Sequence, residues 1–441
     1  MTDSKIKNIF GDDGFRCKYG EKYLTKKFLS NFAISIGKYY KKKYKKPKCI
    51  IGIDTRKTGP KIFKIISREL LNLDVDVHYC GVIPSPGISF VLSKYNFHFG
   101  IMITASHNSF GDNGIKLFNN QGFKLNFSDE KKIEVLIRKN LKKKGVIRIK
   151  RKNYRYYPFE NSDYRQKYFE FLKRKINPLI IEKKVIIDCS NGASSYLINK
   201  LFKKTKNVVI INNKPNGVNI NLNCGSLHTK KLQKILIKKN YDFALALDGD
   251  SDRCVLVDKN NGLIASEKVI FLFLKILNKK KSEKTICSSE IVNKALELNL
   301  SRIGYSLLQT KVGDRNVINH TKKKGAIIGF EPSGHFYFPN LNNSMDGNLS
   351  IILILNYLKK YAGNFDKILK LNSHKRIIEN IKISSTNIPL YEIKKKLSKF
   401  KLLSHEKLLI RQSIWDPIYR VYYDYNSINR FAKIKKILLN K

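Results

Sequence analysis

The first candidate for chemistry is a serine that follows an apolar run. Ser106 lies in the polar stretch Thr104–Asn108, directly after residues 99–103. A short apolar run of this kind predicts a buried strand, so Ser106 is expected where a loop leaves that strand. With His107 beside it and Lys116 ten residues further on, the serine could act as a nucleophile or carry a phosphoryl group. A Ser–His pair is also common in ordinary turns, so this motif alone leaves the function open.

A cluster of aspartates follows a second apolar run. Residues 242–247 predict another buried strand, and Asp248, Asp250 and Asp252 come directly after it. Carboxylates on alternate residues at a strand end direct their oxygens into one small volume, where they repel one another unless a cation binds. An all-oxygen ligand set suits Mg²⁺. A solvated turn and a calcium loop are the alternatives. An EF-hand is disfavoured because its twelfth position, counted from Asp248, is Lys259 rather than glutamate.

Strand-like and helix-like segments alternate around these motifs. Residues 49–53 predict a strand, residues 61–71 an amphipathic helix and residues 75–79 another strand. The same order begins again near residue 184 and a third time after Asp252. Strands separated by helices favour parallel α/β sheets, and a smaller α+β segment is expected to close the chain.

Seven motifs, in one order along nearly the whole chain, resemble those of the α-D-phosphohexomutase family. They occupy residues 10–16, 53–56, 103–116, 248–253, 312–315, 331–335 and 411–420. The resemblance implies an α/β fold with three similar mixed α/β domains plus a smaller C-terminal α+β domain around a central cleft. It divides the chain into residues 1–155 with a phosphoserine loop, 156–253 with a magnesium-binding loop, 254–366 with a sugar-binding loop and 367–441 with a phosphate-binding loop.

The resemblance also implies a reaction in which the enzyme transfers its own phosphoryl group to the substrate and later takes one back. Ser106 would carry the group, donate it to a free hydroxyl of a sugar phosphate, and take back the other phosphate of the bisphosphate intermediate. The implied cofactor is Mg²⁺, bound by Asp248, Asp250, Asp252 and an oxygen on phosphorylated Ser106.

Further roles follow from the same resemblance. Lys116 corresponds to the family's proposed general base, and we expect Arg16, Arg253 and the metal to lower its pKa. Both arginines would bind a phosphate in transit. His107 would support the phosphoserine loop, and His335 is the other acid/base candidate.

Two motifs are expected to bind the substrate away from the reacting phosphate. In both motifs the chain departs from the family at some positions, because Phe330 and Pro332 are unusual, and Ile414 and Trp415 replace a glycine and a threonine. Isoleucine resists the φ > 0 conformations that glycine permits, and tryptophan removes a hydroxyl, so we expect a looser phosphate site and a raised KM. The predicted substrate-binding residues are Gly313, Asp314, Arg315, Glu331, Ser333, Arg411, Ser413 and Arg420.

The residues in these motifs most resemble those of family members that act on amino sugars. It implies interconversion of glucosamine 6-phosphate and glucosamine 1-phosphate, which supplies UDP-N-acetylglucosamine for the cell envelope. Asp314 or Glu331 could face the protonated 2-amino group, and the sequence leaves open which of them does. A phosphomannomutase or phosphoglucomutase is the alternative. A homologue that has lost catalysis is a further one, favoured by departures at Asp12, Cys17 and Ser109.

Composition limits the remaining classes of function. A chain of 441 residues, 42% of them hydrophobic, predicts several domains with cores of their own. The net charge of +51 comes from lysines spread along the whole chain, and no nucleic-acid-binding motif accompanies them, so no specific nucleic acid partner is expected. No apolar run is long enough to span a bilayer, and the seven cysteines form no C-x-x-C pair. We expect a cytoplasmic monomer or homodimer, away from membranes, that binds a small-molecule hexosamine phosphate.

Overall fold

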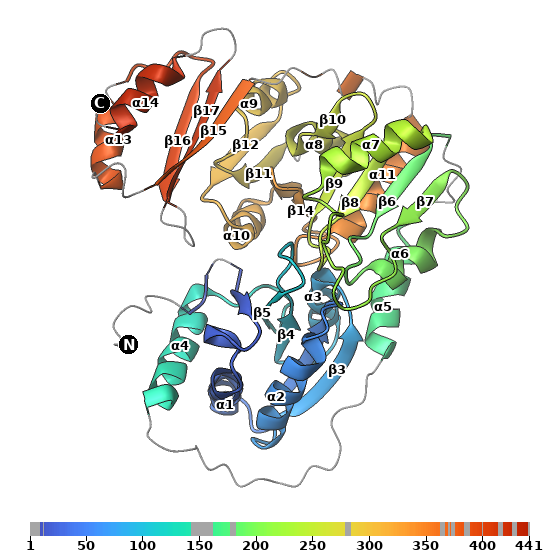
Figure 1. Cartoon of the computed structure of the whole chain (residues 1–441), viewed down its shortest axis with the longest axis vertical. Helices are drawn as coiled ribbons and strands as arrows, with labels where there is room; N and C mark the ends of the chain where they lie inside the picture. The colour runs from blue at the N-terminus through green and yellow to red at the C-terminus, as the bar shows by residue number, and fades with distance from the viewer. Residues whose placement is uncertain are drawn as a thin grey trace.

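The protein is described here from a computed structural model in which four β-sheets are laid out around a central region (Figure 1). The described residues are 9–11, 13–142, 162–176, 182–277, 284–361, 367–368, 371, 375–382, 389–398, 400–412, 418–425 and 430–439. Each sheet with its helices is called a domain below, numbered along the chain. In this part of the chain, no helix combines the length and apolar character needed to cross a membrane.

The first domain contains a five-stranded mixed sheet in the order β1-β5-β4-β2-β3. Strands β2, β3 and β4 are parallel, whereas β5 runs antiparallel to both β4 and β1. The strands are β1 Phe15–Lys18, β2 Lys48–Ile53, β3 Asp76–Val82, β4 Phe99–Ile103 and β5 Asp112–Asn119. The helices are η2 Lys22–Leu24, α1 Lys26–Lys41, α2 Gly59–Leu71, α3 Ser85–Lys94 and α4 Phe127–Lys142.

The second and third domains repeat this pattern. Their sheets have the orders β10-β9-β8-β6-β7 and β12-β11-β13-β14. The strands are β6 Val185–Asp188, β7 Val208–Ile211, β8 Phe243–Leu247, β9 Cys254–Asp258, β10 Gly262–Ile264, β11 Thr285–Ser289, β12 Ser306–Thr310, β13 Ile328–Glu331 and β14 His335–Tyr337. The helices are α5 Ser162–Lys173, α6 Ser195–Phe202, α7 Thr229–Lys239, α8 Ser266–Leu277, α9 Lys294–Ser301, α10 Asp314–Lys324 and α11 Gly347–Tyr361.

The prediction of parallel sheets is wrong at one edge of each domain. The centre of each sheet is parallel, but β4–β5, β8–β9 and β13–β14 pair antiparallel. The connections between these strands, residues 104–111, 248–253 and 332–334, are too short for the helical crossover that a parallel strand requires. They are equivalent loops in the three domains, and each contains one of the motifs found in the sequence.

The fourth domain is smaller and differs in type. Its antiparallel sheet has the order β15-β17-β16 and packs on two helices. The strands are β15 Lys375–Lys382, β16 Lys407–Gln412 and β17 Ile418–Tyr425, and the helices are α13 Leu390–Ser398 and α14 Phe431–Leu439. The predicted fold class, three similar mixed α/β domains and a smaller α+β domain, is therefore confirmed.

One hydrophobic core joins the first three domains. Alternation along β4 sends Ile101 and Ile103 into a cluster with α1 and α2, and sends Met102 to the opposite face. There Met102 belongs to a core that continues through α3 and α5 to α11. Because the second and third domains contribute to this same core, the loops after β4, β8 and β13 are held in a fixed relation. The fourth domain has a core of its own.

A partly buried ion pair attaches the fourth domain to the third. Asp424, which is 1% exposed, accepts hydrogen bonds from Arg376 at 2.5 and 2.8 Å. Its Oδ2 also accepts the backbone N–H of Lys294, at the start of α9, at 2.9 Å. Arg376 in turn donates to the carbonyl of Ile291 at 2.6 Å. The two side chains thus connect the fourth domain's sheet to the loop before α9.

Substituting Asp424→Ala leaves the partly exposed Arg376 guanidinium without its carboxylate, and losing hydrogen bonds to a charged group typically costs about 1.5–3 kcal/mol. We expect a lower melting temperature for the fourth domain in calorimetry and faster limited proteolysis. The control is Lys435→Ala, because Lys435 is exposed and pairs with Glu379 at 2.6 Å at the surface; its effect should stay below about 1 kcal/mol. Equal behaviour of the two variants would show that Asp424 does not carry the attachment.

Candidate active site

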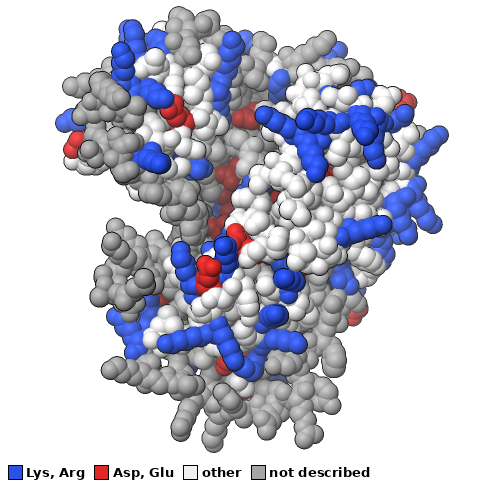
Figure 2. Space-filling view, viewed as in Figure 1, with Lys and Arg blue, Asp and Glu red and all other residues white. Residues whose placement is uncertain are grey.

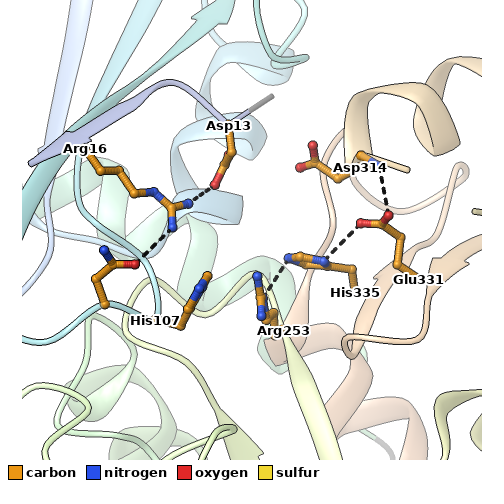
Figure 3. Close-up of a pocket in the computed structure, with 9 residues that line it drawn as sticks. Asp13, Arg16, His107, Arg253, Asp314, Glu331 and His335 are labelled. Carbon is orange, nitrogen blue, oxygen red and sulfur yellow. Dashed lines mark hydrogen bonds and ion pairs between the residues drawn. The ribbon is translucent and has the colours of Figure 1, made fainter. Parts of the chain in front are cut away.

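A cavity of about 460 Å³ opens where the first three domains meet. The space-filling view shows a hollow near the middle of the molecule, with acidic side chains inside it (Figure 2). In the close-up, residues of the first domain face residues of the third across the cavity, with Arg253 of the second domain between them (Figure 3). The lining residues are Asp13, Arg16, His107, Asn108, Arg253, Gly313, Asp314, Glu331 and His335.

Ser106 lies in a strained turn directly beside the aspartate cluster. Its φ is 51°, in the left-handed region that serine rarely adopts, and the residue is 1% exposed. The hydroxyl donates to Asp248 Oδ2 at 2.7 Å and lies 3.3 Å from His107 Nδ1. Burial, with Arg253 and Arg16 nearby, lowers the pKa of His107 to about 3, so the imidazole beside Ser106 is neutral.

Arg56 holds the Ser106 loop through hydrogen bonds to its backbone. We did not predict this role from the motif at residues 53–56. Its side chain is fully buried, and Nε donates to Asp54 Oδ2 at 2.9 Å. The other nitrogens donate to backbone carbonyls of the loop: those of Ser106 at 3.0 Å, Asn108 at 2.8 Å, Asp112 at 2.9 Å, and also Ser109. A single guanidinium therefore satisfies carbonyls that a buried loop cannot leave unpaired.

The three aspartates converge as the sequence predicts. Asp248, Asp250 and Asp252 are buried, and one oxygen from each lies within 4.8 Å of the others. Burial, together with the charges of Asp252 and Asp250, raises the pKa of Asp248 to about 7. Asp250 Oδ1 is buried and has no hydrogen-bond partner among the described residues. Three clustered carboxylates with one unpaired oxygen are a donor set that fits Mg²⁺.

The side chains around Lys116 raise its pKa, whereas we expected Arg16, Arg253 and the metal to lower it. Its Nζ lies 2.7 Å from Asp250 Oδ2, 2.8 Å from Asp252 Oδ2 and 3.1 Å from Asp13 Oδ2, with the side chain 1% exposed. Burial acts to lower the pKa, but these three carboxylates outweigh it and raise the pKa well above its usual value. The prediction counted Arg16, Arg253 and the metal, and missed the carboxylates that surround Nζ.

His335 occupies the third-domain side of the cavity between two carboxylates. Its Nε2 lies 3.1 Å from Asp252 Oδ1, and its Nδ1 lies 3.3 Å from Glu331 Oε2. Burial and Arg253 act to lower the pKa of His335, but the two carboxylates raise it to about 9. Ser333 Oγ is 3.0 Å from the same Nδ1. The predicted residues Glu331, Ser333 and His335 are thus brought together.

Asp13 is a central residue that the sequence reasoning missed. Its carboxylate contacts Arg16, Lys116 and Lys124, and Lys124 extends further to Asp314 of the third domain. Burial acts to raise the pKa of Asp13, but these three cations hold it well below its usual range. Asp13 lies in the motif at residues 10–16, and this motif was the available signal. The Asp13–Lys124–Asp314 contacts connect two walls of the cavity.

Other predicted residues lie elsewhere. Arg315 points away from the cavity lining and binds Glu130 of α4 at 2.7 and 2.8 Å, with its guanidinium 4.3 Å from the Phe127 ring centre. Arg411 and Arg420 face each other on β16 and β17 and do not line the cavity. Their roles remain predictions.

The residues that depart from the family motifs lie in different places in the structure. Phe330 is buried in the shared core, so its side chain is not part of the cavity lining. Pro332 accepts a hydrogen bond from Ser266 Oγ at 3.0 Å through its carbonyl. Ser413, Ile414 and Trp415 lie outside the described residues.

Comparison with known proteins gives consistent matches along the chain. Family models match three α/β/α domains of phosphoglucomutase/phosphomannomutase: domain I at residues 7–144, domain II at 166–262 and domain III at 265–374. A phosphoglucosamine mutase of Clostridium kluyveri is 32% identical over 426 residues, 94% of each chain. Another, of Caldicellulosiruptor bescii, is 33% identical over 452 residues, 96% of this chain and 97% of the other.

Solved structures share the fold. A phosphoglucomutase/phosphomannomutase family protein from Burkholderia thailandensis has a TM-score of 0.80 at 20% identity, covering 97% of this chain and 95% of that one. An Aspergillus fumigatus N-acetylphosphoglucosamine mutase in complex with GlcNAc-6P and magnesium has a TM-score of 0.59 at 14% identity, covering 100% and 96%.

Substituting Arg56→Met should destabilise the protein, because it leaves the buried Asp54 carboxylate without its cation and removes the donor to the carbonyls of Ser109 and Asp112. The expected loss is about 3–5 kcal/mol, measured as a lower denaturant midpoint of unfolding. Arg68→Met is the matched control: that arginine is 42% exposed and, among the described residues, its side chain pairs only with the neighbouring Glu69, so its midpoint should be close to that of the wild type. A stable Arg56→Met protein would mean that the loop carbonyls find other donors.

Proposed function

Because this chain belongs to the phosphoglucomutase/phosphomannomutase family, we propose that it interconverts glucosamine 6-phosphate and glucosamine 1-phosphate. It is an isomerase that moves a phosphoryl group within one sugar. The observation that carries the proposal is the Ser106 hydroxyl, 2.7 Å from Asp248 at the edge of the aspartate cluster and next to a cavity lined by arginines. The two phosphoglucosamine mutases at 32% and 33% identity support the choice of sugar.

In our proposal Ser106 carries the phosphoryl group. In the first transfer the P–O bond to Ser106 breaks and a P–O bond to the free sugar hydroxyl forms, while that hydroxyl loses its proton. The resulting bisphosphate turns around. In the second transfer the other phosphoryl group moves to Ser106, and the sugar oxygen that it leaves takes up a proton. Both transfers need a group that exchanges the proton. We assign this role to Lys116, whose pKa the charge of a metal on Asp250 and Asp252 would lower, with His335 as the alternative.

We further propose that Mg²⁺ is held by Asp248, Asp250, Asp252 and an oxygen on phosphorylated Ser106. The convergence of three carboxylate oxygens and the unpaired Asp250 Oδ1 support this assignment. A related mutase that contains magnesium has the same fold. When bound, the ion supplies positive charge to the phosphoryl oxygens during transfer.

The remaining roles concern the substrate. We propose that Arg16 and Arg253 bind the phosphate in transit, since both line the cavity. His107 would support the phosphoserine loop. Gly313, Asp314, Glu331 and Ser333 would contact the sugar, whereas Arg411, Ser413 and Arg420 of the fourth domain would bind the non-reacting phosphate. Under this proposal the domains keep the boundaries 1–155, 156–253, 254–366 and 367–441, and the reaction takes place in the cytoplasm.

The direct test is Ser106→Ala, which removes the phosphoryl carrier. Turnover should fall by about 10² or more, and a protein treated with glucose 1,6-bisphosphate should no longer become heavier by one phosphoryl group in intact mass spectrometry. Ser109→Ala is the control, because Ser109 lies on the same loop and is exposed. Wild-type turnover in Ser106→Ala would exclude Ser106 as the carrier.

Substrate preference separates the proposal from the phosphomannomutase alternative. Asp314 and Glu331 both line the cavity, so an ammonium group at C2 should be favoured by about 1.5–3 kcal/mol. We therefore expect kcat/KM for glucosamine 1-phosphate to exceed that for mannose 1-phosphate by about 10- to 100-fold. Glucose 1-phosphate, which lacks only the amine, is the control substrate. If mannose 1-phosphate gives the higher value, the chain is a phosphomannomutase.

A further inference from the structure

We propose that Asn221 of the second domain is a positioning residue for Ser106. In this assignment its side-chain amide holds the backbone of the Ser106 loop at the distance from Asp248 that phosphoryl transfer requires. The inference rests on the proposed function, in that Ser106 is taken as the phosphoryl carrier. Asn221 itself does not line the cavity, so it acts through Ser106 rather than on the substrate.

The contacts of Asn221 cross from one domain to another. Its Nδ2 donates to the carbonyl of Ser106 at 2.8 Å and to the carbonyl of Asn108 at 2.9 Å. An amide nitrogen has two hydrogens, so both bonds can form together. The same two carbonyls accept from Arg56 Nη2 at 3.0 and 2.8 Å. The loop is therefore held by a donor from its own domain and by a second donor from the neighbouring domain.

The loop needs such support because its backbone is strained. A residue other than glycine in the left-handed region, as Ser106 is with φ 51°, costs on the order of 1–3 kcal/mol and persists only when its surroundings enforce it. Asn221 is itself left-handed, with φ 56°, a conformation that asparagine tolerates better than most residues. Its backbone N–H donates to the carbonyl of Ser190 at 2.9 Å, which attaches it to the loop after β6.

Gly249 shows how closely these parts pack. A Cβ added at Gly249 would lie 2.6 Å from the Ser106 carbonyl oxygen and 2.8 Å from Asn221 Nδ2. Gly249 stands between Asp248 and Asp250. The carbonyl and the amide therefore lie directly against the backbone of the aspartate loop, and a shift of either would change the 2.7 Å distance between Ser106 Oγ and Asp248 Oδ2. Asn221 thus fixes the phosphoryl carrier relative to the carboxylates.

The test uses two variants of Asn221 and one matched control in the full chain. Asn221→Gly keeps the left-handed backbone and removes the donor. Asn221→Asp keeps the shape and directs an acceptor at two carbonyls. The control is Asn223→Gly, because Asn223 is exposed and has a similar φ of 55°. Hydrogen exchange of the amides of residues 104–112 is measured in the unphosphorylated proteins, followed by kcat, KM and phosphorylation of Ser106 by glucose 1,6-bisphosphate.

We expect faster exchange of residues 104–112 in both Asn221 variants, kcat lower by about tenfold and KM within about twofold of the wild type. Asn221→Asp should be the more impaired of the two, and Asn223→Gly should match the wild type in every measurement. A loss of folding would instead speed hydrogen exchange throughout the chain. If Asn221→Gly behaves in that way, Asn221→Asp is used in its place, because aspartate has nearly the same size and shape as asparagine.

Wild-type kcat and exchange in both variants, or a raised KM with unchanged kcat, would overturn the inference. Failure of the proposed function is distinct, because the wild type itself would then show no phosphorylation of Ser106. The exchange comparison would still decide whether Asn221 holds the loop.

Discussion

The structure depends on a balance of buried charge where the first three domains meet. Carboxylates of Asp13, Asp250 and Asp252 surround the ammonium of Lys116. An isolated charge in such a place is very costly, so each of these groups needs its partners nearby. Because the partners belong to different domains, the balance exists only when those domains are assembled. The core that continues through α3, α5 and α11 provides that assembly.

One topological element is used three times for different chemistry. In each α/β domain the third parallel strand is followed by a short loop and an antiparallel return strand. The first such loop contains the Ser106 hydroxyl, the second contains the three carboxylates, and the third is followed by the imidazole of His335. Adjacent loops also bind each other: Ser106 donates to Asp248, and the backbone N–H of Cys254 donates to the carbonyl of Gly334 at 2.9 Å. Repetition of the fold therefore brings unlike groups to one point.

The sequence predicted those features that depend on local pattern. Apolar runs located β4 and β8, and the spacing of Asp248, Asp250 and Asp252 predicted their convergence. It could not predict features that depend on contacts between distant segments. The antiparallel return strands follow from loop length rather than from hydrophobic period. The raised pKa of Lys116 depends on carboxylates that are 103 or more positions away in the sequence. Asn221 has no local signal at all, because its partners lie in a different domain.

The separate core of the fourth domain affects which amino-acid substitutions the chain can accept. Substitutions inside that core disturb no packing in the other three domains, because its apolar residues form a cluster of their own. Its attachment through Arg376 and Asp424 reaches mainly backbone groups, the carbonyl of Ile291 and the N–H of Lys294. Backbone partners are independent of side-chain identity. The fourth domain is therefore a modular unit, and a chimera that carries it from a relative should assemble if that arginine–aspartate pair is retained.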